Sequence, residues 1–289
     1  MPRLLLFGGM GQVGRALRRS APSEWVVESH DVGETDIRDE RAVRAAVGGA
    51  RPDVIINCAA YTNVDGAESH ADEARILNAD AANNVARAAA AAGVRLIHLS
   101  TDYVFDGTTS SPYRPDSPTG PLNVYGRTKL AGEQCVRASA PKSTIVRTAW
   151  IHSGGASNFV ATAVRHLTAG RAMRVVDDQV GTPTRAGELA TALWHLANRS
   201  EVEGTLHFTD TGVASWFDVA VAVLETLRAD GRLPSGASVT PIATADYPTP
   251  ARRPAYSVLD KHDSWVSIGY VPPHWRDGVV ASTYELLNA

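Results

Sequence analysis

Tyr125 and Lys129 lie four residues apart in the stretch NVYGRTKLAGE, which is typical of a loop entering a helix. The spacing alone decides little, because side chains at positions i and i+4 share one face of almost any helix. The residue types are more informative. An ammonium near a phenol stabilises the phenolate and moves the pKa of the phenol from about 10 toward the neutral range. Such a phenol can protonate the oxygen of a carbonyl that receives a hydride.

The scarcity of lysine favours this chemical interpretation. Only 3 of the 28 basic residues are lysines, namely Lys129, Lys142 and Lys261. Where bare positive charge suffices the chain uses arginine, whose wide guanidinium cannot approach a hydroxyl as closely as an ammonium can. Lys129 is therefore more informative than a lysine in an average protein.

Further hydroxyl groups are expected to meet this pair. The stretch HLSTDYVFDG ends a strand-like run at Ser100 and Thr101, and Thr101 lies 24 residues before Tyr125. In a sheet of parallel strands, the carboxyl ends of the strands form the ligand crevice. We therefore expect Ser100 and Thr101 to reach the same site as Tyr125 and Lys129.

The glycines of LLLFGGMGQVGRALRR indicate a phosphate-binding turn. They stand at positions 8, 9, 11 and 14, directly after the first strand-like run and at the start of a helical one. Glycine permits a tight turn and the close approach of a pyrophosphate, which then lies against free amides at a helix N-terminus. A plain turn at a crowded helix–sheet contact is the alternative. The cofactor-binding residues predicted here are Gly8, Gly11, Gln12, Val13 and Gly14.

An acidic residue follows at the distance that a dinucleotide requires. Asp31 lies 20 residues after Gly11, where an acid commonly holds the ribose hydroxyls of adenosine. This position favours NAD. Arg15, Arg18 or Arg19 could instead receive the 2′-phosphate of NADP, so NADPH and NADH both remain open.

The loop TDIRD, residues 35–39, comes next. Asp36 and Ile37 stand where adenine would lie, and we predict that both contact the cofactor. Asp39 is interpreted more simply, as the N-cap of the following helix.

Strand-like and helical stretches alternate through the first 150 residues, which predicts an α/β fold: a Rossmann-type, doubly wound parallel sheet with helices on both faces. The apolar runs VIIN and LIHLS fit strands that are buried on both sides. We assign residues 1–150, with a returning segment near 176–200, to an NAD(P)-binding domain. Residues 151–175 and 201–289 would form a smaller C-terminal α/β domain that binds substrate, with a strand-like AYSVLD and a final helix.

Composition excludes several classes of protein. The chain has 289 residues and a formal charge of −3, so it offers no basic face for nucleic acid and no polybasic membrane segment. Cys58 and Cys135 are the only cysteines, and no zinc-site or disulfide pattern surrounds them. The apolar run at the N-terminus is too short for a signal peptide, and no run of about 18 apolar residues follows. We expect a cytoplasmic protein that binds small molecules.

Three elements together resemble the signature of the extended short-chain dehydrogenase/reductases: the glycine-rich first turn, the Ser or Thr after the fourth strand, and Tyr-x-x-x-Lys. Further blocks resemble one branch, the dTDP-4-dehydrorhamnose reductases, in family order and across nearly the whole chain. They are LLLFGGMGQVG, RPDVIINCAAYTNVDGAE, LSTDYVFDG, PLNVYGRTKLAGE, IVRTAWI, NFV, VVDDQVGTPT and RRPAYSVLD. The resemblance implies NAD(P)H-dependent reduction of the 4-keto group of dTDP-4-dehydro-β-L-rhamnose to dTDP-L-rhamnose.

The resemblance also implies roles for single residues. Thr101, Tyr125 and Lys129 would be catalytic, with Tyr125 as the proton donor and Lys129 also reaching the nicotinamide ribose. Further cofactor contacts would come from Ala59, Ala60 and Thr62. The substrate-binding residues would be Val64, Asp65, Thr101, Asp102, Tyr103, Trp150, Asn158 and Arg252.

Some of these positions have a simpler interpretation. Trp150 stands at the end of a strand and could belong to the core. Residues 181–184, GTPT, would sit where the second domain meets the nucleotide, but Thr184 could equally be an N-cap. Arg252 and Arg253 are candidates for binding the substrate diphosphate, since arginine pairs well with phosphate oxygens, and could equally have surface or interdomain roles.

The chain departs from the family in one respect. Some members are described as dimers bridged by Mg²⁺ through carboxylates, one of them in the first helix. Here that helix, GQVGRALRRS, has no carboxylate, and Glu188 and Glu285 cannot replace it by sequence argument alone. We predict that Mg²⁺ is not essential, while a homodimer stays compatible with the sequence.

Two other functions remain open. Another dTDP-4-keto-deoxysugar could be the substrate, because the configuration of one hydroxyl can change without touching these motifs. The same fold also serves a non-catalytic, NADP-binding regulatory subunit. The presence of Thr101, Tyr125 and Lys129 together favours an enzyme.

Overall fold

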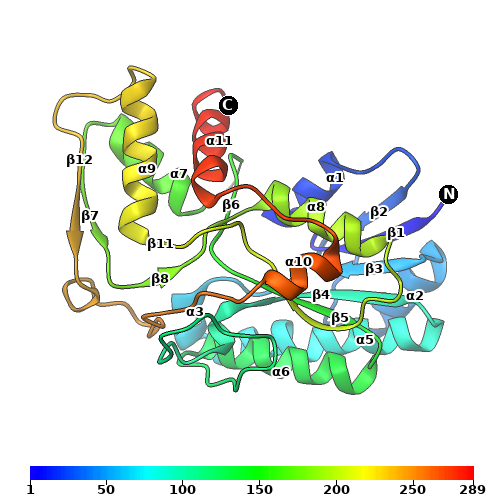
Figure 1. The fold of residues 1–289 in the computed structure, drawn as a ribbon. Coiled ribbons are helices and arrows are strands. Elements are labelled where there is room, and N and C mark those ends of the chain that lie inside the picture. Colours follow the sequence, from blue (N-terminus) through cyan, green and yellow to red (C-terminus); the bar gives the residue numbers. More distant parts are fainter. Residues whose placement is uncertain (156) are drawn as a thin grey trace.

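The centre of the protein is a sheet of six parallel strands, in the order β10-β5-β4-β3-β1-β2 (Figure 1). The computed structural model describes residues 1–155 and 157–289. The strands are β1 Arg3–Phe7, β2 Val26–His30, β3 Val54–Asn57, β4 Arg95–Thr101, β5 Thr144–Thr148 and β10 Gly204–His207. Successive side chains of a strand point to opposite faces, so the apolar runs in β1 and β3 require a cover on both faces.

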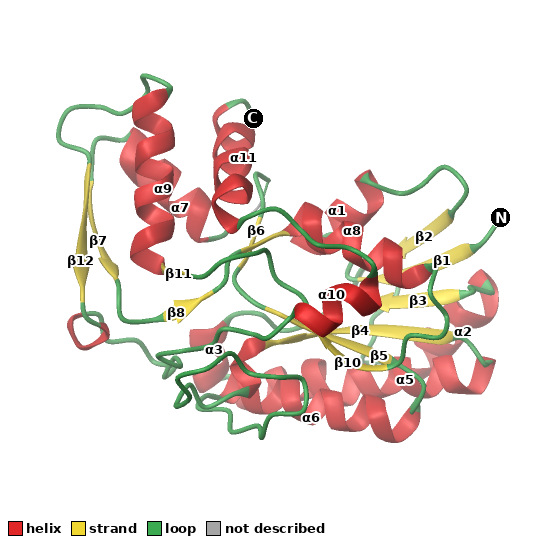
Figure 2. Ribbon diagram, viewed as in Figure 1, coloured by secondary structure: helices red, strands yellow, loops and turns green. Residues whose placement is uncertain are grey.

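Helices provide that cover (Figures 1 and 2). Leu4 and Leu6 face one layer, formed by α1 Gln12–Arg19, α8 Ala186–Ala197 and α10 His262–Ile268. Leu5 and Phe7 face the other layer, formed by α2 Glu40–Ala50, α5 Ala81–Ala92 and α6 Val124–Ser139. The predicted doubly wound Rossmann-type sheet is therefore confirmed. Asp39 is the N-cap of α2, as expected, because its side chain accepts a hydrogen bond from the amide of Arg41 at 2.8 Å.

The segment between β3 and α5 consists of three short helical pieces. It comprises α3 Val64–Ser69, α4 Ala71–Arg75 and a π-helical turn, Ile76–Asp80. Such turns insert one extra residue into a helix and often occur at functional sites. Asn78 in this turn accepts a hydrogen bond from the amide of Tyr61 at 2.8 Å and donates one to the hydroxyl of Thr128 at 3.0 Å. The turn thereby fixes α6 against the loop after β3.

A second, smaller part of the protein lies over the carboxyl ends of the strands (Figure 1). Its core joins α7 Phe159–Thr168, α9 Trp216–Ala229 and α11 Trp275–Leu287 to a parallel pair of strands, β7 Ala172–Val176 and β12 Ser238–Ile242. Pro241 lies within β12, where a two-stranded sheet tolerates the loss of one amide donor. Two short ladders complete this part, namely β6 Ile151–His152 with β9 Thr184–Arg185, and β8 Val180–Gly181 with β11 Ala214–Ser215.

Two expectations from the sequence need correction, and one alternative that the sequence left open is excluded. Residues 201–289 do not lie wholly in the smaller part, because β10 pairs with β5 in the central sheet and α10 packs on its face. The stretch AYSVLD forms isolated bridges at Tyr256 and Leu259 but no regular strand. Thr184 lies in β9, and the N-cap position of α8 is Arg185. Each of these segments is too short for the sequence to show the apolar periodicity of a helix or a strand.

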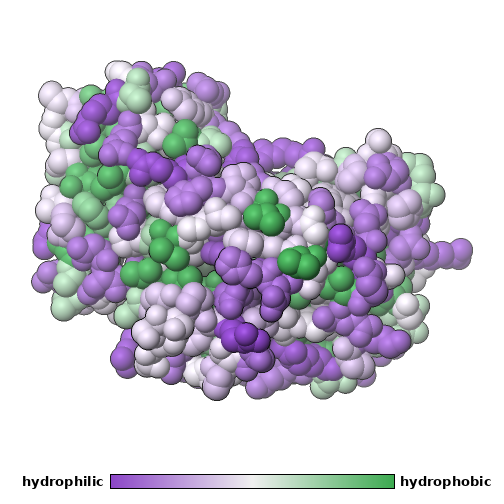
Figure 3. Space-filling model, in the orientation of Figure 1, coloured by the Kyte–Doolittle hydropathy of each residue, from purple (hydrophilic) through white to green (hydrophobic). Residues whose placement is uncertain are grey.

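On the face drawn in Figure 3, polar residues cover most of the surface and hydrophobic residues occur in small groups. No helix in residues 1–155 or 157–289 has the length and apolar character needed to cross a bilayer.

A buried ion pair fastens α6 to the sheet. The guanidinium of Arg147 on β5 donates to both carboxylate oxygens of Glu133 on α6, at 2.8 and 2.7 Å. The hydroxyl of Ser100 donates to the same carboxylate at 2.6 Å. Both charged side chains are at most 3% exposed. Removing one partner would leave an uncompensated charge in the interior.

We predict that Glu133→Gln lowers the free energy of unfolding by about 3–5 kcal/mol, because Arg147 then stays buried without its counter-ion. Urea unfolding followed by circular dichroism measures the change. Glu40→Gln is the control, since Glu40 pairs with Arg44 at the surface, and the unfolding midpoint should barely move. Equal effects of both substitutions would contradict the assignment.

Candidate active site

A cavity of about 1130 Å³ opens where the carboxyl ends of the strands meet the smaller part. A site for one small molecule usually measures about 300–1,000 Å³, so this cavity has room for two ligands side by side. The predicted residues that line it are Gly8, Gly11, Gln12, Val13, Gly14, Asp31, Asp36, Ile37, Ala59, Ala60, Thr62, Val64, Thr101, Asp102, Tyr103, Tyr125, Lys129, Trp150 and Asn158.

The glycine turn forms one end of the cavity. Gly8 has φ +82°, in the left-handed region that favours glycine, and a Cβ there would lie 2.6 Å from the amide nitrogen of Ala59. A Cβ on Gly14 would lie 2.2 Å from the carbonyl oxygen of Gly8. Gly11 occupies the N-cap position of α1, and no side chain in the described chain caps that turn. The free amides at this helix end fit a diphosphate.

Acidic and basic side chains lie along the next stretch of the cavity. The carboxylate of Asp31 accepts a hydrogen bond from the amide of Met10 at 2.8 Å. Asp36 pairs with Arg38 at 2.6 Å, and the hydrogen bond to Arg38 lowers the pKa of the Asp36 carboxyl. Arg15 also lines the cavity, so carboxylates and guanidinium groups both stand where the adenosine ribose is expected.

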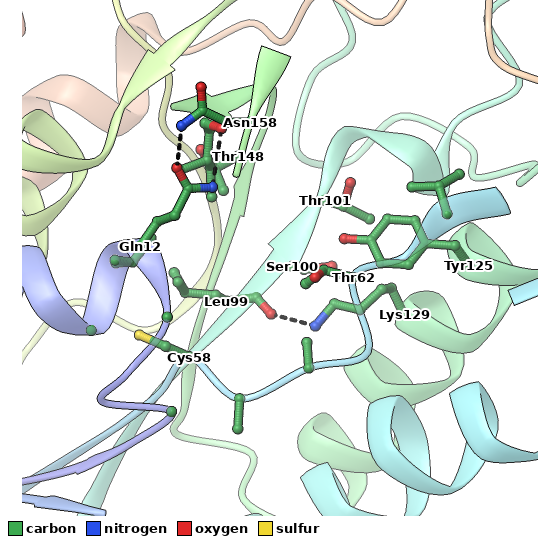
Figure 4. A pocket seen from close by; sticks show the side chains of 18 of the residues that line it. Gln12, Cys58, Thr62, Leu99, Ser100, Thr101, Tyr125, Lys129, Thr148 and Asn158 are labelled. Carbon is green, nitrogen blue, oxygen red and sulfur yellow. Dashed lines mark hydrogen bonds between the residues drawn. The ribbon is translucent and has the colours of Figure 1, made fainter. Parts of the chain in front are cut away.

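Figure 4 shows the opposite end, where Tyr125 and Lys129 enter the cavity from α6 beside Ser100 and Thr101 at the end of β4. Asn123 caps α6 by accepting a hydrogen bond from the amide of Gly126 at 2.7 Å, so the helix begins just before Tyr125. The cap therefore sets the position of both reactive groups relative to β4.

The Lys129 ammonium is buried below the phenol. Its Nζ donates a hydrogen bond to the carbonyl oxygen of Leu99 at 2.8 Å, and only 3% of the residue is exposed. Burial lowers the pKa of Lys129 to about 8, while the charges of Glu133 and Cys58 act in the opposite direction. The ammonium form is thus still present at pH 7.

The expected lowering of the Tyr125 pKa is not found in this structure. Burial raises the pKa of Tyr125 to about 12, and the negative charge of Asp102 adds to this, while a side-chain hydrogen bond with Thr101 opposes it. Lys129 is not among the causes of this shift, and its ammonium bonds to the carbonyl oxygen of Leu99. The phenol therefore keeps its proton at neutral pH, the state required of a proton donor.

Thr101 and Asp102 form a pair at the end of β4. The hydroxyl of Thr101 donates to the carboxylate of Asp102 at 3.0 Å and accepts a hydrogen bond from the amide of Tyr103 at 3.2 Å. Burial raises the pKa of Asp102 to about 7. The ring of Tyr103 meets that of Tyr125 edge to face, with centroids 6.0 Å apart. These contacts hold Thr101 and Tyr125 in one corner.

Asp65 and Arg252 are the predicted site residues that do not line the cavity. The carboxylate of Asp65 is bound by Arg253 at 2.8 Å and by the amide of Ala251 at 3.1 Å. Arg252 is exposed, and its contribution is a backbone carbonyl that accepts a hydrogen bond from Asn123 at 2.8 Å. Arg253, rather than Arg252, is the arginine turned toward Asp65.

Gln12 and Asn158 were expected to serve different ligands, yet they contact each other (Figure 4). The amide nitrogen of Asn158 donates to the side-chain oxygen of Gln12 at 3.0 Å, and the same oxygen accepts from Ser153 at 3.0 Å. Asn158 also caps α7 by accepting from the amide of Ala161 at 3.0 Å. The glycine turn is thereby tied to the smaller part.

Several cavity residues escaped the sequence analysis. Arg38 stands next to two predicted residues and could have been found by extending that loop. The sequence SWFD of residues 215–218 does predict a helix start, and the structure has a capping box there. Nothing local indicates that Trp216 reaches Trp150, because the two are separated by most of the smaller part.

The carboxylates expected at a family metal site are held by arginine instead. Arg185 donates to Glu188 at 3.4 Å and also to Glu285. In the described residues, no group of three or more His, Cys, Asp or Glu side chains could hold a metal ion. That Mg²⁺ is not essential stays a prediction.

Known proteins resemble the chain over its whole length. The family described as the RmlD substrate binding domain matches residues 2–288. A dTDP-4-dehydrorhamnose reductase of Mycolicibacterium smegmatis is 45% identical over 99% of this chain and 86% of its own. A probable dTDP-4,6-dihydroxy-2-methyloxan-3-one 4-ketoreductase of Streptomyces antibioticus is 41% identical over 99% of this chain and 96% of its own.

A solved structure agrees with these relatives. The dTDP-4-dehydrorhamnose reductase of Bacillus anthracis, in complex with NADP, has a TM-score of 0.91 at 34% identity and covers 99% of this chain and 100% of its own. Both the sequence and the fold therefore place this chain in the dTDP-4-dehydrorhamnose reductase family.

Proposed function

We propose that this chain reduces the 4-keto group of dTDP-4-dehydro-β-L-rhamnose with NADPH or NADH and so forms dTDP-L-rhamnose. The observation that carries the proposal is one cavity with a phosphate-binding glycine turn at one end and Thr101, Tyr125 and Lys129 at the other. Membership of the family supplies the substrate class.

The chemistry of the site follows from the protonation state of its groups. When bound, the reduced nicotinamide supplies the hydride to the carbonyl carbon. Tyr125, whose pKa is raised to about 12, donates its Oη proton to the carbonyl oxygen as negative charge develops there. Thr101 can donate a hydrogen bond to the same oxygen once its single hydroxyl proton turns away from Asp102. The product is the alcohol, and the phenol recovers its proton from solvent.

Lys129 acts from below the phenol. Its ammonium is present at pH 7, because its pKa is about 8. With cofactor bound, Lys129 would hold a hydroxyl of the nicotinamide ribose, using the ammonium that donates to the carbonyl of Leu99 here. The positive charge then stabilises the phenolate that remains after proton donation.

Cofactor contacts are supported by the glycine turn and by the groups beside it. The free amides of α1 suit the diphosphate, and Asp31 suits the adenosine ribose. Arg38 and Arg15 suit a 2′-phosphate, in line with the NADP present in the solved Bacillus anthracis relative.

The substrate-binding roles of Val64, Asp102, Tyr103, Trp150 and Asn158 belong to the same proposal, supported by their place in the cavity. Arg253 is the better candidate for the substrate diphosphate than Arg252, since Arg253 is partly buried near the cavity. The division into a cofactor-binding and a substrate-binding domain also stays a proposal, with β10 and α10 moved to the former. We also propose that the protein is cytoplasmic and forms a homodimer.

A coupled assay tests the function. We expect oxidation of NADPH or NADH when the dTDP-4-keto sugar is supplied, with full activity after EDTA treatment. Formation of dTDP-L-rhamnose, identified by NMR, separates this function from that of the Streptomyces antibioticus relative, whose name denotes another 4-keto sugar. Absence of turnover would favour a regulatory subunit, and recovery with Mg²⁺ after EDTA would contradict the metal prediction.

Tyr125→Phe should reduce kcat by about 10²–10⁴-fold, the usual contribution of a positioned acid, because it deletes only the donated proton. The dissociation constant of NADPH, measured by fluorescence titration, should stay within about threefold of the wild-type value. Tyr103→Phe is the matched control, since this second phenol also lines the cavity, and its kcat should fall far less. Near-normal turnover of Tyr125→Phe would contradict the assignment of Tyr125 as the proton donor.

The pH dependence of the reaction should reflect the titration of the Lys129 ammonium. Its pKa in the folded protein is lowered from 10.5 to about 8, so the ammonium is lost as the pH rises through that value. We therefore expect kcat/KM for NADPH, which reflects the free enzyme, to fall above pH 8. Lys129→Met should lack this decline. Lys261→Met should keep it, although the pKa of Lys261 is also about 8, because Lys261 lies outside the cavity lining. The reverse pattern would assign the decline to Lys261.

A further inference from the structure

Trp150 has a backbone conformation that a tryptophan rarely adopts. Its φ is +48°, and among the described residues the only other non-glycine residue with positive φ is Arg51, at the end of α2. Side chains with a Cβ disfavour this region, so the surrounding structure must hold Trp150 in place. The residue lies between β5 and β6, two positions after Thr148, and lines the cavity.

No hydrogen bond orients the Trp150 indole. Its ring nitrogen is buried and has no hydrogen-bond partner in residues 1–155 or 157–289. The orientation of the ring therefore depends on what packs against it. One face lies on the indole of Trp216, with ring centroids 3.7 Å apart and an interplanar angle of 8°.

Gly181 closes a further side of the Trp150 ring. A Cβ at this position would lie 2.7 Å from Cε2 of Trp150, so only a glycine leaves the ring enough space. Gly181 and Trp216 are connected through one ladder. Gly181 of β8 pairs with Ala214 of β11, and Trp216, the first residue of α9, follows β11 directly. The ladder thus brings both Gly181 and Trp216 against the Trp150 ring.

Trp216 is itself fixed by polar contacts. Its ring nitrogen donates to the side-chain oxygen of Gln179 at 3.2 Å. The amide nitrogen of Gln179 donates to the hydroxyl of Thr244 at 3.0 Å, and that hydroxyl donates to Asp178 at 2.6 Å. Phe159 meets Trp216 edge to face at 5.0 Å. Together these contacts fix the orientation of the Trp216 ring.

We propose that Trp216 is a positioning residue that holds Trp150 against the bound sugar, with Gln179 fixing the Trp216 ring. The proposal rests on the proposed function, because it takes Trp150 as a wall of the sugar site. It extends that function by assigning specificity for the sugar to the β8–β11 ladder, which belongs to the smaller part. The cofactor site contains neither strand.

Three variants test the proposal. Trp216→Leu removes the stacked ring, Trp216→Phe retains an aromatic face, and Gln179→Ala removes the hydrogen bond while leaving the ring in place. Phe217→Leu, on the same helix but outside the cavity lining, is the matched control. The affinity of dTDP-L-rhamnose is measured by calorimetry, together with KM for the 4-keto sugar, kcat and the dissociation constant of NADPH.

We expect Trp216→Leu to weaken dTDP-L-rhamnose binding and to raise KM roughly two- to tenfold, the range for one aromatic pair, with NADPH binding unchanged. Trp216→Phe should restore most of the loss, and Gln179→Ala should shift both values in the same direction. The exciton contribution of the Trp150–Trp216 pair to circular dichroism should be lost in Trp216→Leu and kept in Phe217→Leu, while the Trp25–Trp194 pair contributes equally in both.

Unchanged sugar affinity in Trp216→Leu and Gln179→Ala would overturn the proposal, as would an equal loss of NADPH affinity. The calorimetry needs no turnover, so its outcome is separate from that of the proposed function. A wild-type protein that binds dTDP-L-rhamnose but does not reduce the 4-keto sugar refutes only the catalytic function. A wild-type protein that does not bind dTDP-L-rhamnose refutes both.

Discussion

The burial of the Lys129 ammonium is the constraint on which the site depends. A charge so well covered is costly, and here it is offset by the carbonyl of Leu99 and by the negative charge of Glu133 one turn further along α6. Glu133 is in turn held by Arg147 from the sheet. Tyr125, Lys129 and Glu133 recur at every fourth position, so one helix face joins the proposed proton donor to the core. A rotation of α6 would break all three relations together.

Local patterns predicted the parts of this site that follow from local physics. The glycine turn is fixed by the need for a positive φ at Gly8 and for close contact at Gly14, and both needs appear as residue types. The residue type of Asp39 likewise predicts the N-cap of α2. The apolar runs in β1 and β3 predict a sheet covered on both faces. A strand with one face in solvent would instead alternate polar and apolar residues.

The remaining features depend on contacts between distant segments. β10 has four residues and becomes a strand because β5 offers it a free edge. Trp216 lies in the cavity because β11 pairs with β8. The protonation of Tyr125 could not be derived from its spacing to Lys129, since the direction of the ammonium is set by a carbonyl on another element. The choice between Arg252 and Arg253 likewise depended on which side chain meets Asp65.

The path of β10 and α10 bears on how the protein is made. The chain leaves the sheet after β5, builds α7 and β7, and returns first as α8, then as β10 and at last as α10. The edge of β5 lacks its partner until residue 207 has left the ribosome, and one face of the sheet lacks part of its cover until residue 268 has done so. The sheet begun by the N-terminal half is therefore completed only by segments from the C-terminal half of the chain.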